Sequence, residues 1–175
     1  MSRRATIRRA RLLSQREVPP IPLGPDGQPL GLTLADIRLA AQAARVLLAL
    51  TEAIEARQPG LERSEDVRRN LIDSDACLSE AVAHAEAQGV PEAGIMLLPS
   101  RLLGLMHGAV FGVQYTHDAQ VAAQSIDPTA PTLHEMTLAL TGQELPSLAA
   151  LAQIGEQLIR ISDALNGKSA GGMQA

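Results

Sequence analysis

The chain has 175 residues and a net charge of −4 from 15 basic and 19 acidic side chains, and 46% of its residues are hydrophobic. Only one Phe and one Tyr are present, whereas Ala and Leu together make up close to a third of the chain. This apolar content is too high for a wholly disordered protein. The scarcity of β-branched and aromatic residues argues against a β-sandwich or barrel. The single cysteine excludes an intramolecular disulfide framework and any zinc site built from several cysteines.

Basic residues are concentrated at the N-terminus. Residues 1–31 carry a net charge of +4 and residues 32–175 a net charge of −8. Six arginines precede the first acidic residue: Arg3, Arg4, Arg8, Arg9, Arg11 and Arg16. Residues 18–31 contain five prolines and three glycines, which block helix and favour turns. We therefore expect residues 1–31 to be largely disordered or extended, with a basic arm over 1–17 and a Pro/Gly-rich linker outside the packed core.

The N-terminus also bears on localisation. Ser2-Arg3-Arg4 matches the start of a twin-arginine signal, but no apolar segment follows it, which argues against export by that route. An Arg-rich start also suits an organellar transit peptide or a signal for a specialised secretion machine, and the simplest interpretation is a solvated tail. The excess of Arg over Lys and the abundance of Ala are typical of a GC-rich coding sequence. We therefore expect a bacterial, cytoplasmic protein.

Helical patterns begin at residue 32 and define a domain over 32–167. Thr33 is the predicted N-cap of a helix over 34–57, which ends before a Pro-Gly pair. Its polar residues fall on one narrow strip, so we expect neighbours to cover this helix on most sides. A second helix is predicted over 64–88, with acidic residues in its first turn. Its narrow packed edge consists of Val67, Leu71, Ser74, Leu78, Ala81 and Ala85.

A third helix is predicted from Pro99 to Ser125. The segment is long and apolar enough to resemble a membrane span, but Pro99, Arg101 and His107 interrupt it and no basic cluster flanks it. We therefore expect no membrane span. A buried central helix, with its proline in the first turn, is the better interpretation.

Three glycines recur every four residues on the third helix and form a glycine ridge: Gly104, Gly108 and Gly112. Each costs about 0.5–1 kcal/mol in a helix relative to Ala, so three in register predict that another helix comes close. Both aromatic residues, Phe111 and Tyr115, lie beside this ridge, on a face that also carries His107 and Asp118. We interpret the ridge as packing within one fold and the aromatic residues as core anchors with hydrogen-bonded polar neighbours. The alternatives are a homodimer interface at the glycines and a groove in which the aromatic pair binds a partner helix.

Two further helices complete the domain. Thr132 begins a short helix with a Thr-x-x-Glu capping box, and that helix ends near Gly142. A last helix begins at Ser147 and is closed by Gly167, which leaves 168–175 as a frayed tail. Short Pro/Gly loops favour antiparallel neighbours. The sequence therefore predicts an all-α, antiparallel bundle of four long helices and one short helix.

One constellation points to metal chemistry. His84 is followed by the adjacent pair His117-Asp118 and by a later aspartate, Asp163, with Asp127 as the alternative. This pattern is similar to that of metal phosphohydrolases of the HD type, which use a His, an adjacent His-Asp pair and a later Asp on separate helices. The residues after Asp118 lack the Gly and Lys that commonly follow in that family, and Cys77 lies among acidic residues that disfavour a nucleophilic thiol. Because no phosphate-cradling loop or nucleophile elbow is present either, we expect no enzyme activity, cofactor or metal.

The sequence favours a non-catalytic protein–protein interaction module: an adaptor, chaperone-like or regulatory protein that presents helical surfaces to a partner or to itself. Candidate partner-binding residues are Phe111, Tyr115 and the glycine ridge. The alternative is a nucleic-acid-associated accessory protein that binds phosphates through the arginines of residues 1–17, without reading sequence. The same arm would suit an acidic protein surface or an anionic membrane. The metal phosphohydrolase is the third hypothesis.

Overall fold

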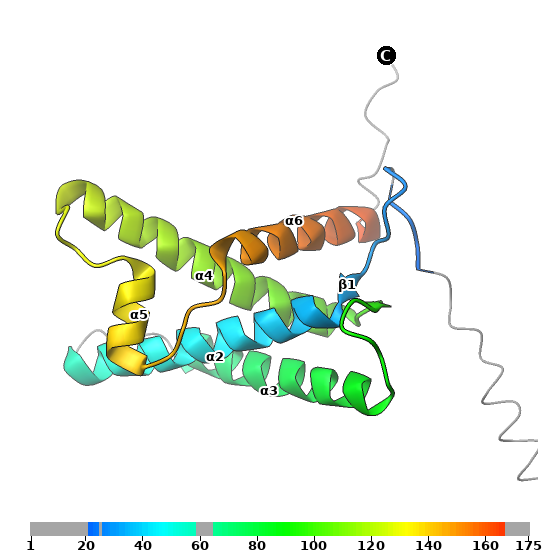
Figure 1. The fold of residues 1–175 in the computed structure, drawn as a ribbon, viewed down its shortest axis with the longest axis horizontal. Helices are drawn as coiled ribbons and strands as arrows, with labels where there is room; N and C mark the ends of the chain where they lie inside the picture. The colour runs from blue at the N-terminus through cyan, green and yellow to red at the C-terminus, as the bar shows by residue number, and fades with distance from the viewer. Residues whose placement is uncertain (1–20, 25, 59–64, 167–175) are drawn as a thin grey trace, which may run out of the picture.

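The computed structural model describes residues 21–24, 26–58 and 65–166. In chain order the elements of these ranges are β1 (Leu32–Thr33), α2 (Leu34–Arg57), α3 (Glu65–Ala87), β2 (Ile95–Met96), α4 (Ser100–Ile126), α5 (Leu133–Thr141) and α6 (Leu148–Leu165). Four of the helices are long and α5 is short, so the predicted all-α bundle is confirmed (Figure 1). The predicted arm over 1–17 and the tail over 168–175 lie outside the described residues.

α2 is the central helix. The Thr33 side chain accepts a hydrogen bond from the backbone N–H of Asp36 at 3.2 Å, and the Asp36 carboxylate accepts one from the N–H of Thr33 at 2.8 Å. This capping box begins the helix at the predicted position. Ten of its 24 residues are buried, and α3, α4, α5 and α6 all contact it. The prediction that neighbours cover this helix on most sides is confirmed.

α3 runs antiparallel to α2, and ion pairs line their contact (Figure 1). From one end to the other these pairs are Arg38–Glu86, Arg45–Asp75 and Arg68–Glu52. Each pair is largely exposed and contributes about 1 kcal/mol at most. The three pairs are spread over 14 residues of α2 and 18 residues of α3, so together they help to set the register of the two helices.

α4 is apolar but only partly buried. Of its 27 residues only Met106, Ala109, Val110 and Val113 are buried. Its C-terminal end diverges from α2 (Figure 1), and Ile126 is 88% exposed there. The prediction of a buried central helix over 99–125 is therefore wrong, because the centre is occupied by α2 and α4 packs through one side. None of the described helices combines the length and hydropathy that a membrane crossing requires.

A two-stranded antiparallel sheet lies at the start of α2. Leu32 pairs with Met96 and Thr33 with Ile95. The preceding Gly31 allows this contact, since a Cβ atom there would lie 2.5 Å from the Ile95 side chain and 3.0 Å from the Met96 carbonyl oxygen. Strands of two residues are too short to show an alternating pattern, and the sequence predicts none here.

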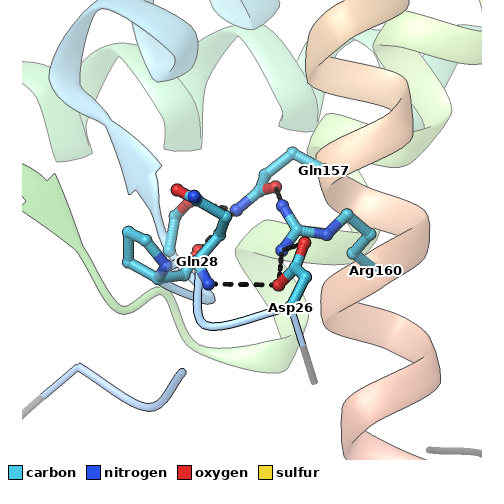
Figure 2. Close-up of polar contacts among 6 residues, drawn as sticks. Asp26, Gln28, Gln157 and Arg160 are labelled. Carbon is cyan, nitrogen blue, oxygen red and sulfur yellow. Dashed lines mark hydrogen bonds and ion pairs between the residues drawn. The ribbon is translucent and has the colours of Figure 1, made fainter. Parts of the chain in front are cut away.

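The residues before β1 form a turn that packs on α6 (Figure 2). Arg160 donates to both carboxylate oxygens of Asp26 at 2.7 Å, and the Gln157 side chain donates to the carbonyl oxygens of Pro29 and Gly31 at 2.9 and 3.0 Å. The backbone N–H of Gln28 and the Arg160 guanidinium hold the pKa of Asp26 below its ordinary value of 3.8. These bonds connect the turn to α6 across more than 120 residues of sequence.

Leu30 in this turn belongs to the hydrophobic core. It is 8% exposed, whereas Leu23 at the other side of the same turn is 64% exposed. The expectation that residues 18–31 lie outside the packed core is therefore wrong for Leu30. Prolines and glycines predict irregular backbone correctly, but irregular backbone can still place one apolar side chain in a core when side chains such as Gln157 satisfy its carbonyl groups.

We expect Leu30→Ala to lower the free energy of unfolding by about 2–3 kcal/mol, because it removes a buried side chain from the core. The matched control is Leu23→Ala, in the same turn but exposed, which should change that free energy by less than about 0.5 kcal/mol. Urea denaturation followed by circular dichroism measures both. Equal, small effects would mean that the turn does not contribute to the core.

Candidate protein-binding groove

A groove with a volume of about 470 Å³ lies between α3 and α4. The α3 wall consists of Val67, Asn70, Leu71 and Ser74, and the α4 wall of Gly108, Gly112, Tyr115, Thr116 and Ala119. Leu47 of α2 lies at the bottom of the groove, where a Cβ atom on Gly112 would come within 2.9 Å of its Cδ1 atom. Most of the lining is apolar or small, and both walls have helical spacing.

The glycine ridge explains why this groove is open. A Cβ atom added at Gly108 or at Gly104 would have no neighbour within 4 Å, so only Gly112 packs closely within the fold. The prediction that the whole ridge packs against a neighbouring helix of the same fold is therefore wrong for Gly104 and Gly108. These glycines lie roughly opposite the buried side of α4 that carries Met106 and Val110, so the ridge turns outward. Gly104 lines a second cavity, of about 330 Å³, between α4 and α6.

The two aromatic residues have different surroundings. Tyr115 lines the groove and is 78% exposed. Phe111 is half-buried, its ring centre lies 4.2 Å from that of His107, and its Cζ atom would contact a Cβ atom on Gly155 of α6 at 3.4 Å. Phe111 therefore packs in the α4–α6 contact, and the predicted core-anchor role is wrong for Tyr115.

The predicted hydrogen bonds around these aromatic residues are not formed among the described residues. The side chains of Tyr115, His107 and Asp118 make no hydrogen bond there, and Tyr115 and Asp118 are exposed. Successive spacings of four, four and three residues correctly predict that His107, Phe111, Tyr115 and Asp118 share one broad face of α4. They do not predict which residues of this face are exposed, because that depends on where α3 and α6 lie.

Acidic residues lie about one helical turn from groove-lining residues on both α3 and α4. On α3, Asp66 and Asp73 lie four residues before and three residues after Asn70, so they flank it on the exposed side of the helix. On α4, Asp118 lies three residues after Tyr115. All three carboxylates are exposed, and no described basic side chain forms an ion pair with them. The ion pairs that join α3 to α2 lie on the opposite side of α3.

The predicted metal ligands are not brought together. His84 is on α3, His117 and Asp118 are on α4, and Asp163 is on α6. Among the described residues, no three His, Cys, Asp or Glu side chains lie close enough together to hold a metal ion. His84 is exposed and its Nε2 atom lies 3.2 Å from the Gln88 side chain one turn later. The arm arginines, Arg3, Arg4, Arg8, Arg9, Arg11 and Arg16, lie outside the described residues.

Several groove residues are not among the predicted site residues. Val67 is predicted as part of a packed edge but is 42% exposed. Thr116 and Ala119 continue the small-residue pattern of the glycine ridge by one and two turns, and that continuation is a signal available in the sequence. The α3 wall carries no such signal, because its position beside α4 is a property of the fold.

No family model, no curated protein and no solved structure matches the chain. The inference of function therefore depends on the groove itself. It is mostly apolar, has small residues on α4, and has acidic residues about one turn from its lining on both helices. These features suit the apolar side of a helix better than a small anionic ligand.

We expect Gly104→Ala and Gly108→Ala each to raise the free energy of unfolding by about 0.5–1 kcal/mol, because the new methyl group meets no neighbour and alanine favours helix. Gly112→Ala is the matched control, and its gain should be smaller because Leu47 must move. Urea denaturation of dilute protein measures these differences. A loss of stability in Gly104→Ala or Gly108→Ala would show that a neighbour packs against the ridge within the protomer.

Proposed function

We propose that this protein is a non-catalytic protein–protein interaction module that binds a helix of a partner in the α3–α4 groove. The observation that carries this proposal is the position of Tyr115: a large aromatic side chain, 78% exposed, beside a groove lined mainly by apolar residues and by glycine. Tyrosine has an apolar ring and a polar hydroxyl group, and it is enriched among the residues that dominate binding energy at interfaces.

The dimensions of the α4 wall support a helical ligand. Gly108 and Ala119 are eleven residues apart, which is about 16 Å or three turns at 1.5 Å per residue. Because Gly108 has no side chain, the backbone of a docked helix could come as close as helices do at small-residue contacts. Apolar side chains at positions i, i+3 or i+4 and i+7 of the partner would then fill the groove.

The charge near the groove favours one class of partner over another. Exposed Asp66, Asp73 and Asp118 repel phosphate groups, so nucleic acid is a poor ligand for this surface. We therefore propose that this chain acts as an adaptor or regulator by binding a protein and not nucleic acid. The composition supports the further proposal that this role is played in a bacterial cytoplasm.

Replacement of Tyr115 by Ala should weaken partner binding by about 30-fold, equivalent to about 2 kcal/mol, as expected for a dominant aromatic contact. Gly108→Leu should abolish it by filling the groove. Val121→Ala is the control, because Val121 is also exposed on α4 but does not line the groove. Affinity capture from the native cell, with light scattering after size exclusion to detect a second copy as the partner, measures retention. If both groove variants retain the partner as well as Val121→Ala does, the proposal is wrong.

A further inference from the structure

Acidic residues on the two sides of α3 differ in whether they form ion pairs. Towards α2, Asp75 is paired with Arg45 at 2.9 Å and Glu86 with Arg38. On the other side of α3, Asp66 and Asp73 have no ion-pair partner among the described residues, and the Arg69 between them pairs with Glu65 at 3.9 Å. Asp118, one turn after Tyr115 on α4, has none either. Three like charges around one apolar groove favour an occupant that brings cations next to an apolar side.

The N-terminal arm, residues 1–17, combines cations with apolar side chains. Residues 1–17 hold six of the 15 basic residues of the chain and one acidic residue, Glu17. The spacing of Ile7, Ala10 and Leu13 is three residues each, so in a helix these side chains would share about a third of its circumference. Arginines would then lie on both sides of that apolar strip. An apolar strip between cations is complementary to an apolar groove between carboxylates.

The arm is also long enough to reach the groove. The first described residue, Ile21, belongs to the turn that Arg160 and Gln157 hold on α6. Even with residues 7–13 in a helix of about 10 Å, the twenty residues before it can span about 53 Å, whereas α4 itself is about 40 Å long. Because the arm is tethered, its effective concentration at the groove is of the order of millimolar, so even a weak contact would be populated.

We infer that the N-terminal arm of the same chain binds in the α3–α4 groove, with its arginines paired to Asp66, Asp73 and Asp118, and competes there with the partner helix. This inference rests on the proposed role of the groove as a helix-binding surface. It adds a regulatory step, because a partner must displace the arm, and salt or an anionic surface that draws the arm away would expose the groove.

The only tyrosine of the chain provides a local measurement. Since the sequence has no tryptophan and Tyr115 is its sole tyrosine, intrinsic fluorescence reports on the groove alone. In the full-length protein at low salt we expect acrylamide to quench Tyr115 weakly. Changing all six arm arginines to Glu should raise the quenching constant by about twofold or more, since an unbound arm leaves the ring exposed. High salt should have the same effect on the wild-type protein.

A charge exchange tests the specific pairing. A triple variant should also expose Tyr115 to acrylamide: Asp66→Lys, Asp73→Lys and Asp118→Lys. Combining it with the six arginine-to-glutamate changes in the arm should restore the protection of Tyr115 from quenching. The matched control carries Glu144→Lys, Glu156→Lys and Asp163→Lys, three exposed acids that do not line or flank the groove, and should behave as wild type. Protection should be unchanged on about tenfold dilution, because the contact is intramolecular.

Three outcomes would overturn the inference. Equal quenching of wild type and the arginine-to-glutamate variant would show that the arm leaves the groove open. Loss of protection in the Glu144, Glu156 and Asp163 variant, or failure of the charge exchange to restore it, would place the arm elsewhere. If the protection of Tyr115 from quenching disappears on dilution, a second copy of the chain, and not the arm, binds in the groove. Each of these leaves the partner-capture result of Tyr115→Ala unaffected, so failure of the arm and failure of the proposed function are distinguishable.

Discussion

The bundle depends on the small side chains along α2. Ala40, Ala43 and Ala44 are completely buried, and α3, α4, α5 and α6 all contact this one helix. The distance between packed helices is set by the side chains at their contact, so alanine lets several neighbours come close at once. A narrow centre has a consequence for the longest helix. α4 can bury only one side against it, and its remaining apolar surface, Tyr115 included, is left for other contacts.

The helices themselves could be predicted from the sequence because their ends are encoded locally. Thr33 and Thr132 form the predicted capping boxes, and Gly142 ends α5 with a positive φ of 68°. Such signals depend on residues three or four positions apart. The burial of Leu30 could not be predicted in this way, because it depends on Gln157 and Arg160, more than 120 residues later in the chain.

The candidate site could be predicted only in part, for a related reason. The spacing of Gly108, Gly112 and Tyr115 correctly places them on one broad face of one helix. Whether that face is buried depends on the angle at which α4 meets α2 and α3, and glycine-rich helix patterns are compatible with either outcome. The α3 wall follows from that same arrangement, and Val67 consequently has a different environment from the one its heptad-like spacing predicts.

The contact between Asp26 and Arg160 also determines where the chain enters and leaves the bundle. Pro22, near the first described residue, and Leu165, near the last, line one small cavity of about 90 Å³. The two ends of the folded domain therefore lie side by side at the end of α6, and the opposite end of the bundle, where α5 lies, is free of them (Figure 1). Domain ends that lie close together are compatible with insertion of the domain into a larger protein. Such an insertion would leave the α3–α4 groove intact, because none of the groove residues lies at these ends.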